Sequence, residues 1–190
     1  FRVARRARPG RAVWRTTYDF VLAQGTHDGY RRLKVPVLHR RTLVWRKNQF
    51  WLVFDELLGT GATRAANLIH LHPNLDLKLD ERSIWQVLRS AVPLWITAFG
   101  EQGHSIVRGQ LEPAPQGWTS ERFGNLEPNT VLTLHHEGDL ALCFGYVISE
   151  QSPARVQSLV TTAASSQIVI AHADKTYRLS VQKDGSAVFQ

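Results

Sequence analysis

The chain of 190 residues has no methionine and only one cysteine, Cys143. A single thiol cannot form an internal disulfide, which excludes a disulfide-stapled scaffold but excludes no cellular compartment. No apolar run approaches the length that spans a bilayer, so we expect no membrane partner. Because the sequence begins with Phe1 and lacks methionine, we interpret it as a piece of a longer chain or a processed product.

Sequence motifs of the common cofactor-dependent and nucleophilic enzymes are also missing. The chain contains no glycine-rich phosphate loop, no Cys-x-x-Cys, no His-Glu-x-x-His and no Gly-x-Ser-x-Gly. His70 and His72 would point to the same side of a strand, but no acidic residue or cysteine has the spacing to complete a zinc site with them. His135 and His136 would face opposite sides. We therefore expect no cofactor and no metal in this segment, and interpret these histidines as lying on the half-polar face of a sheet.

Arginine, by contrast, is abundant. Of the 23 basic residues 18 are arginine, against 16 acidic residues, and the formal net charge is +7. The planar guanidinium group suits carboxylate, sulfate and phosphate. A cluster of arginines near the start is therefore either a patch for a polyanion or a charged edge, exposed to solvent or covered by another part of a parent chain. The cluster comprises Arg2, Arg5, Arg6, Arg8, Arg11 and Arg15.

Apolar and polar residues alternate with a period of two along most of the chain, as is typical of strands. Together with the length and the hydrophobic content of 43%, this pattern predicts a single domain over residues 1–190. The fold class is expected to be all-β, a two-layer antiparallel sandwich of long strands. One segment, 81–92, also fits a helical stripe, and Pro93 favours a strand there. The expected strands cover 2–7, 11–23, 37–47, 49–57, 65–72, 81–92, 94–99, 105–110, 130–137, 140–148, 167–171, 176–181 and 187–189, with loops at 25–33 and 113–128.

The hairpin of 37–47 and 49–57 is expected to form the centre of the sheet. The second strand is apolar on both faces from Phe50 to Phe54, which favours a central position with Trp51 or Val53 in the core. Asp55 and Glu56 would end this apolar run. The segment 65–72 would then continue an antiparallel meander, and the strands 130–137 and 140–148 would pair across the turn between them.

A loop over 25–33 carries the most reactive group of side chains. His27, Asp28 and Tyr30 place an imidazole, a carboxylate and a phenol together; the imidazole and phenol are acid–base candidates, and the neighbouring arginines could hold an anionic substrate. The alternative is that Asp28-Gly29 only makes a turn. Arg40 and Arg41 alternate across the neighbouring strand, so only one of them could face this loop. The other should cover the opposite face or pair with an acid. The candidate substrate-binding residues are His27, Tyr30, Arg31, Arg32, Arg40 and Arg41.

Five short segments occur in an order that resembles the C-terminal β-sheet domain of heparinase II/III-like proteins. The resemblance extends over residues 1–148 and thins after Pro153. It implies a sandwich of long antiparallel strands, preceded in the same parent chain by an incomplete α/α toroid. The segments are HDGY at 27–30, HRR at 39–41, WLVFDELLGTG at 51–61, IHLHP at 69–73 and GWTSERFGNLEP at 117–128.

The same resemblance implies a lyase that cleaves uronic-acid polysaccharides by β-elimination, which needs a base, an acid and a group that neutralises the uronate carboxylate. The family's main catalytic residues, and the zinc ligands of a His-x-His-x-Asp motif, would lie before Phe1, so none carries over to this chain. One departure is Ala62-Thr63-Arg64, which stands where such proteins often have a histidine. The resemblance implies an anionic polysaccharide as partner, and we expect a periplasmic or secreted location.

Two other classes of function stay open. One is a non-catalytic carbohydrate-binding or scaffolding domain. The other is a basic nucleic-acid-binding domain, which is disfavoured because the arginines are not interleaved with an aromatic stacking platform.

Overall fold

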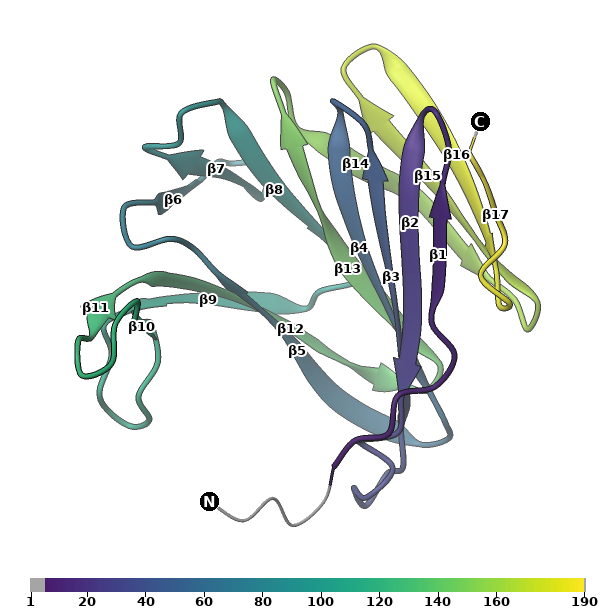
Figure 1. The fold of residues 1–190 in the computed structure, drawn as a ribbon, viewed down its shortest axis with the longest axis horizontal. Coiled ribbons are helices and arrows are strands. Elements are labelled where there is room, and N and C mark those ends of the chain that lie inside the picture. The colour runs from purple at the N-terminus through teal and green to yellow at the C-terminus, as the bar shows by residue number, and fades with distance from the viewer. Residues whose placement is uncertain (1–5, 190) are drawn as a thin grey trace.

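The computed structural model describes residues 6–189, which form strands and connecting turns (Figure 1). Within this range no helix is long and apolar enough to cross a membrane. The strands are β1 (Val13–Thr16), β2 (Phe20–His27), β3 (Leu38–Arg46), β4 (Phe50–Leu58), β5 (Ala62–His70), β6 (Asp76–Leu79), β7 (Ile84–Leu88), β8 (Leu94–Phe99), β9 (Gly103–Arg108), β10 (Trp118–Thr119), β11 (Glu127–Pro128), β12 (Thr130–Asp139), β13 (Leu142–Glu150), β14 (Ala154–Thr161), β15 (Ser165–His172), β16 (Lys175–Gln182) and β17 (Ala187–Phe189).

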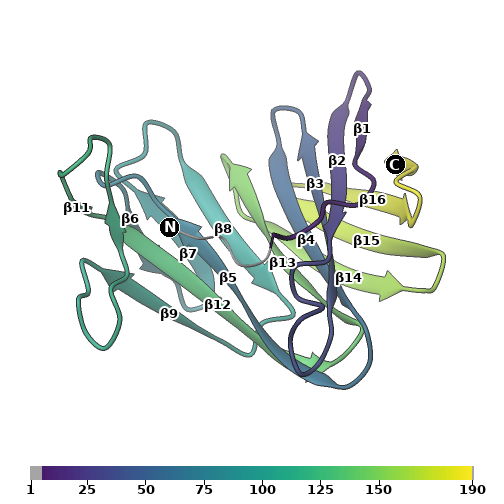
Figure 2. The same cartoon turned by 60° about the horizontal axis from the view of Figure 1, so that its bottom comes forward.

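The predicted all-β, antiparallel sandwich is confirmed. A central sheet of eight strands has the order β1-β2-β3-β4-β13-β8-β7-β6. A four-stranded sheet, β14-β15-β16-β17, packs on one of its faces, and a three-stranded sheet, β5-β12-β9, packs on part of the other (Figures 1 and 2). Each outer sheet therefore forms a two-layer sandwich with a different part of the central sheet.

The alternation of side chains along β4 explains why both faces of the central sheet are apolar. Phe50, Leu52 and Phe54 point into the core shared with the four-stranded sheet, where the facing side chains include Ile168 and Leu179. The intervening residues of β4 point to the opposite face. Burial on both faces is the physical reason for the continuous apolar run in this strand.

The predicted hairpin and the central position of its second strand are confirmed, since β3 pairs with β4 and β4 pairs with β13 on its other edge. Phe50, Val53 and Phe54 are buried, whereas Trp51 is 47% exposed. The expected meander is wrong, because both edges of β4 are occupied and β5 therefore pairs with β12 in another sheet. The expected pairing of β12 with β13 is wrong for a related reason: the two strands follow each other in sequence but belong to different sheets.

The first strands also differ from the sequence prediction. The segment 11–23 forms not one strand but two, β1 and β2, because the hydroxyl of Thr17 accepts hydrogen bonds from the amides of Asp19 and Phe20 and closes a turn. β2 continues to His27, which the prediction placed in a loop. Of the expected strand at 2–7, residues 2–5 lie outside the described residues and 6–7 are not in a strand. β14 was not predicted.

Candidate functional site

Neighbouring strands of the central sheet bring a row of polar side chains onto one face. In the register of the sheet His27 on β2 is opposite His39 on β3, and Arg41 on β3 is opposite Asp55 on β4. The three-stranded sheet partly covers this face. Asn67 on β5 of that sheet approaches the carboxylate of Asp55. The side chains therefore come from both layers of the sandwich.

The two histidines form a directed hydrogen-bond chain. The amide of Gly29 donates to Nδ1 of His27 at 3.2 Å, which places the proton of a neutral His27 on Nε2. That nitrogen lies 2.9 Å from Nδ1 of His39, and Nε2 of His39 lies 2.7 Å from Oδ1 of Asp55. His27 thus donates to His39 and His39 donates to Asp55. Burial lowers the pKa of His27, and the neighbouring His39 lowers it further, which favours the neutral form of His27.

Asp55 is fully buried and is the centre of the network. Arg41 donates to it twice, from Nε at 2.7 Å and from a terminal nitrogen at 2.8 Å, and the Asn67 amide donates at 2.8 Å. Burial alone would raise the pKa of the carboxyl group, but the hydrogen bonds from His39, Arg41 and Asn67 outweigh it and lower the pKa to about 2. Asp55 is therefore a permanently charged anchor and not an acid that exchanges protons near neutral pH.

His136 extends this network into the three-stranded sheet. Its Nε2 lies 3.1 Å from Oδ1 of Asn67, and its Nδ1 donates to the carbonyl of Gly100 at 3.1 Å. The ring stacks on Phe144 of the central sheet, with centroids 3.8 Å apart. Burial lowers the pKa of His136, opposed by its bond to the Gly100 carbonyl. The residue ties the two layers together beneath the site.

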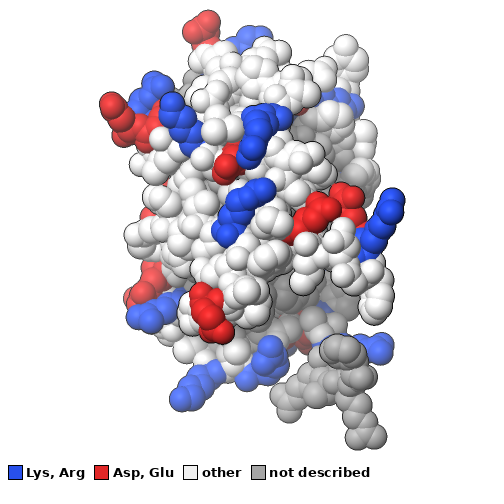
Figure 3. Space-filling model, turned by 90° about the vertical axis from the view of Figure 1, so that its left-hand side faces the viewer, with Lys and Arg blue, Asp and Glu red and all other residues white. Residues whose placement is uncertain are grey.

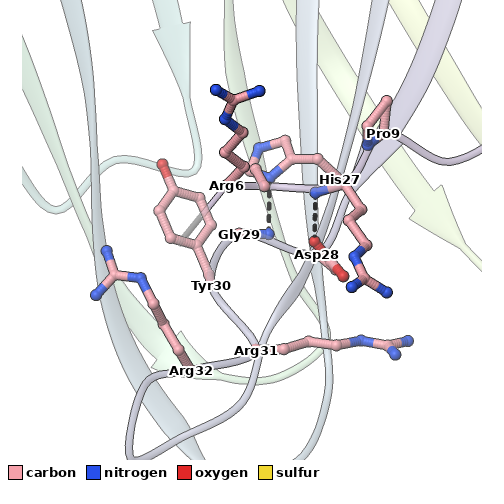
Figure 4. A pocket seen from close by; sticks show the side chains of 10 residues that line it. Arg6, Pro9, His27, Asp28, Gly29, Tyr30, Arg31 and Arg32 are labelled. Atoms are coloured by element: carbon pink, nitrogen blue, oxygen red, sulfur yellow. Dashed lines mark hydrogen bonds between the residues drawn. The ribbon is translucent and has the colours of Figure 1, made fainter. Parts of the chain in front are cut away.

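Beside this network the turn after β2 forms the floor of an open cavity of about 1000 Å³ (Figure 4). The Asp28 carboxylate accepts a hydrogen bond from the amide of Arg8 at 2.6 Å, which fixes the turn to the incoming chain. Tyr30 packs against the ring of His27, with centroids 5.1 Å apart, and is 42% exposed. The lining includes four arginines, which are Arg6, Arg8, Arg31 and Arg32.

The six predicted site residues do not all converge. His27, Tyr30, Arg31 and Arg32 line the same cavity, although Figure 4 shows the last two side chains extending in opposite directions. Arg41 borders a second, smaller cavity of about 280 Å³ that also reaches Tyr30. Arg40 is on the other face of β3, as the alternation predicts for one member of this pair, and there it pairs with an acid.

That acid is Glu56, which is buried next to Asp55 in β4 but points to the four-stranded sheet. It accepts hydrogen bonds from Arg40 at 3.2 Å, from Ser166 at 3.3 Å and from Lys183. Asp55 and Glu56 end the uninterrupted apolar run of the sequence, but they do not end the strand, which was expected over 49–57 and extends to Leu58. Both acids lie inside the strand, and each is neutralised by an arginine opposite it on β3.

Sequence reasoning missed four residues of the network: His39, Asp55, Asn67 and His136. Two of them could have been found from the sequence. His39 lies on the same strand face as Arg41, and Asp55 lies on the second strand of the same hairpin, where it pairs with Arg41. No local pattern marks the other two, because they come from the second layer.

The face of the molecule drawn in Figure 3 offers no comparable concentration of one charge. The face in Figure 3 mixes basic and acidic side chains. Within residues 6–189 no three His, Cys, Asp or Glu side chains lie close enough to hold a metal ion, and His72 instead lies 3.6 Å from Glu121. The cavity at Tyr30 is therefore the strongest candidate site.

The fold and the site therefore define an all-β domain in which a buried Arg–Asp–His network lies beside an arginine-lined cavity. The sequence profile of the family described as heparinase II/III-like, C-terminal, matches residues 1–178, and the chain belongs to this family. No curated protein matches the sequence.

Solved structures of known proteins have a fold similar to that of this chain. A mutant of the heparan sulfate lyase HepC from Pedobacter heparinus superposes with a TM-score of 0.68 at 14% identity, over 92% of this chain and 28% of that chain. A heparinase III gives 0.66 at 13% identity, over 93% of this chain and 27% of that one. At such identities the likeness shows the fold. The chain spans little more than a quarter of those structures.

Proposed function

We propose that this chain is the C-terminal β-sandwich domain of a polysaccharide lyase-like parent protein. In this proposal the parent acts on uronic-acid polysaccharides by β-elimination, and the domain forms one wall of the substrate cleft. The observation that carries the proposal is the cavity at Tyr30, where four arginine side chains surround a fixed turn. Family membership and the fold of the heparinase structures support it.

The residues of this chain would bind and orient the glycan. Arg32 and Arg31 carry guanidinium groups suited to the carboxylate or sulfate of an acidic sugar. The hydroxyl of Tyr30 is exposed enough to bond a sugar hydroxyl. Both ring nitrogens of His27 are engaged within the chain, so this residue orients the turn and does not serve as the base. Asp55 does not repel an anionic substrate, because Arg41 neutralises it.

The remaining chemistry belongs to the rest of the parent. The base and the acid of the elimination would come from an α/α toroid that precedes this domain, which is the partner we propose. A polymer substrate favours a periplasmic or secreted location. We expect this chain alone to show no lyase activity, and turnover of a uronate polymer by the purified chain would contradict that.

Two measurements on the parent test the proposal. The first is the absorbance of unsaturated uronate during incubation with heparin and with alginate. The second is a binding titration with a uronate oligosaccharide, in which Arg32→Gln and Tyr30→Phe should each weaken affinity by up to about tenfold. Arg178→Gln, an exposed position on β16, is the matched control and should bind normally. If the site variants bind as tightly as the control, the assignment of the cleft is wrong.

A second candidate is a carbohydrate-binding domain without catalysis. The cavity itself would support binding alone, because its lining is rich in arginine and both ring nitrogens of His27 are engaged within the chain. Normal oligosaccharide binding by the parent without any unsaturated product would identify this case.

A further inference from the structure

A row of basic side chains leaves the cavity at Tyr30 along the edge of the central sheet. β1 is the end strand of that sheet, and no strand within residues 6–189 pairs with its outer edge. Arg8 lines the cavity, whereas Arg11 and Arg15 lie farther along the same segment and do not belong to the site described above. We term these three arginines the basic track. All three are exposed.

Backbone contacts with β2 hold this segment extended from the cavity to the β1–β2 turn. Pro9 bridges to His27, and the amide of Gly10 donates to the carbonyl of Thr26 at 2.8 Å. Gly10 lies so close to β2 that a Cβ there would clash with the hydroxyl of Thr26. β1 then pairs with β2 as far as Thr16. At about 3.3 Å per residue, the basic track is therefore about 20 Å long.

The far end of the basic track faces the four-stranded sheet. Arg15 is opposite Leu22, whose side chain lies in the core shared with that sheet, and directly opposite residues share a face. The turn between β16 and β17 packs on the same face of β1, since a Cβ at Gly185 would lie 2.7 Å from the side chain of Val13. The track therefore begins at the cavity and follows the sheet edge to the face that carries the four-stranded sheet.

The two outer arginines of the track carry charge that no acid neutralises by direct contact. No ion pair joins Arg11 or Arg15 to an acid within residues 6–189. Asp184 instead accepts hydrogen bonds from the amide and the hydroxyl of Ser186, at 2.8 and 2.7 Å. These bonds lower the pKa of Asp184, and the nearby charges of Arg11 and Arg15 lower it further. Guanidinium groups without a carboxylate partner suit the carboxylates or sulfates of a ligand.

We propose that the basic track is a second binding site for the polysaccharide, which holds the part of the polymer that extends beyond the cavity at Tyr30. The choice of ligand rests on the proposed function. A linear acidic glycan carries charged groups at regular intervals, so it can meet successive arginines along an extended strand. Binding at the track would keep the polymer attached and raise its local concentration at the cavity.

A single-stranded nucleic acid is the other common linear polyanion. Sites for it combine basic side chains with aromatic side chains on which the bases stack. Val13 lies between Arg11 and Arg15 and shares the face of Arg15, and it offers no ring for stacking. The composition of the track therefore favours a glycan.

The dependence of affinity on glycan length tests the basic track in the parent protein. The probes are a heparin tetrasaccharide and a long heparin chain, with concentrations expressed per sugar residue. The wild-type parent should bind the long chain at least about fivefold more tightly, because contacts with the track add to those in the cavity. Arg11→Gln combined with Arg15→Gln should remove most of this gain and leave the tetrasaccharide affinity unchanged. A double variant that keeps the gain would overturn the proposal.

The matched control removes two exposed arginines from another part of the molecule. Arg89 follows β7 and Arg122 lies between β10 and β11, and Figure 1 shows these elements on the opposite side of the molecule from β1. Arg89→Gln combined with Arg122→Gln changes the net charge equally and should keep the gain with length. If this control loses the gain as well, the effect is one of total charge and the track is not a site.

Further outcomes separate this proposal from its alternatives. Single-stranded DNA that binds as tightly as long heparin, and is weakened by the track variant, would assign the track to nucleic acid. Charged side chains can also serve only to prevent pairing of an edge strand; the track variant would then self-associate while binding long heparin normally, which contradicts a binding role. If the long chain binds through the track but the tetrasaccharide does not bind, the proposed function fails and the track stands.

Discussion

Arg41 holds Asp55 through two parallel hydrogen bonds of 2.7 and 2.8 Å, across adjacent strands of the central sheet. The carboxylate is fully buried, whereas the arginine side chain is 44% exposed. The pair therefore fixes a positive group at the border of the candidate site. His39 and Asn67 occupy further positions around the same carboxylate.

Removing the buried carboxylate should be costly. Asp55→Ala leaves Arg41 without its buried partner and His39 and Asn67 without an acceptor, and we expect a loss of about 3–5 kcal/mol in the free energy of unfolding. Asp174→Ala, at an exposed turn between β15 and β16, should change it by less than about 0.5 kcal/mol. Urea denaturation measures both. A loss for Asp55→Ala as small as that of the control would contradict a central role for the network.

The pKa of Asp55 predicts a pH dependence of stability. Its folded pKa of about 2 lies below the ordinary value of 3.8. As the pH falls, Asp55 therefore takes up its proton at a higher pH in the unfolded chain than in the folded chain. Its contribution to the free energy of unfolding is complete above pH 4 and is lost as the pH falls toward 2. The pKa difference corresponds to about 2 kcal/mol. Comparing urea midpoints of wild type and Asp55→Asn should show their difference shrinking between these pH values, and a constant difference would show that the pKa is not lowered.

On the opposite face, Glu56 attaches the four-stranded sheet to the centre. Lys183→Met removes one of its donors and should cost about 1–3 kcal/mol in the free energy of unfolding. Lys175→Met, at an exposed position at the start of β16, should be nearly neutral. Hydrogen exchange would locate the effect, since Lys183→Met should accelerate amides of β15 and β16 more than those of β12. Uniform acceleration throughout would indicate that Glu56 does not act as a link between these sheets.

Two adjacent aromatic residues on β4 should differ sharply in how much each contributes to the free energy of unfolding of this chain. Phe50→Ala empties a position that is 1% exposed and should cost about 3–5 kcal/mol in the free energy of unfolding. Trp51→Ala removes a side chain that is 47% exposed and should cost less than half as much. Thermal and urea denaturation of the two variants measure this contrast. Equal losses would show that Trp51 is covered even in the isolated chain.

The period of two in the sequence determined much of the architecture. It is sufficient to predict most of the strands, the hairpin of β3 and β4 and the central position of β4, because side chains alternate between faces whatever the neighbouring strand is. The same rule separates Arg40 from Arg41, and the one that turns away was expected to cover the opposite face or to pair with an acid. The cluster at His27, Tyr30 and Arg32 was likewise evident, since its members are adjacent in the chain.

Only the tertiary structure decided which strands pair and which acids are buried. Alternation defines the face of a strand but not its neighbour, so β5 and β12 could not be placed in a separate sheet from the pattern alone. In the sequence Asp55 resembles the end of an apolar run. Only the folded structure brings Arg41 from β3 and Asn67 from the facing layer into contact with it. His136 lies 69 residues from Asn67, and a contact of that separation has no local signature because it depends on how two sheets pack face to face.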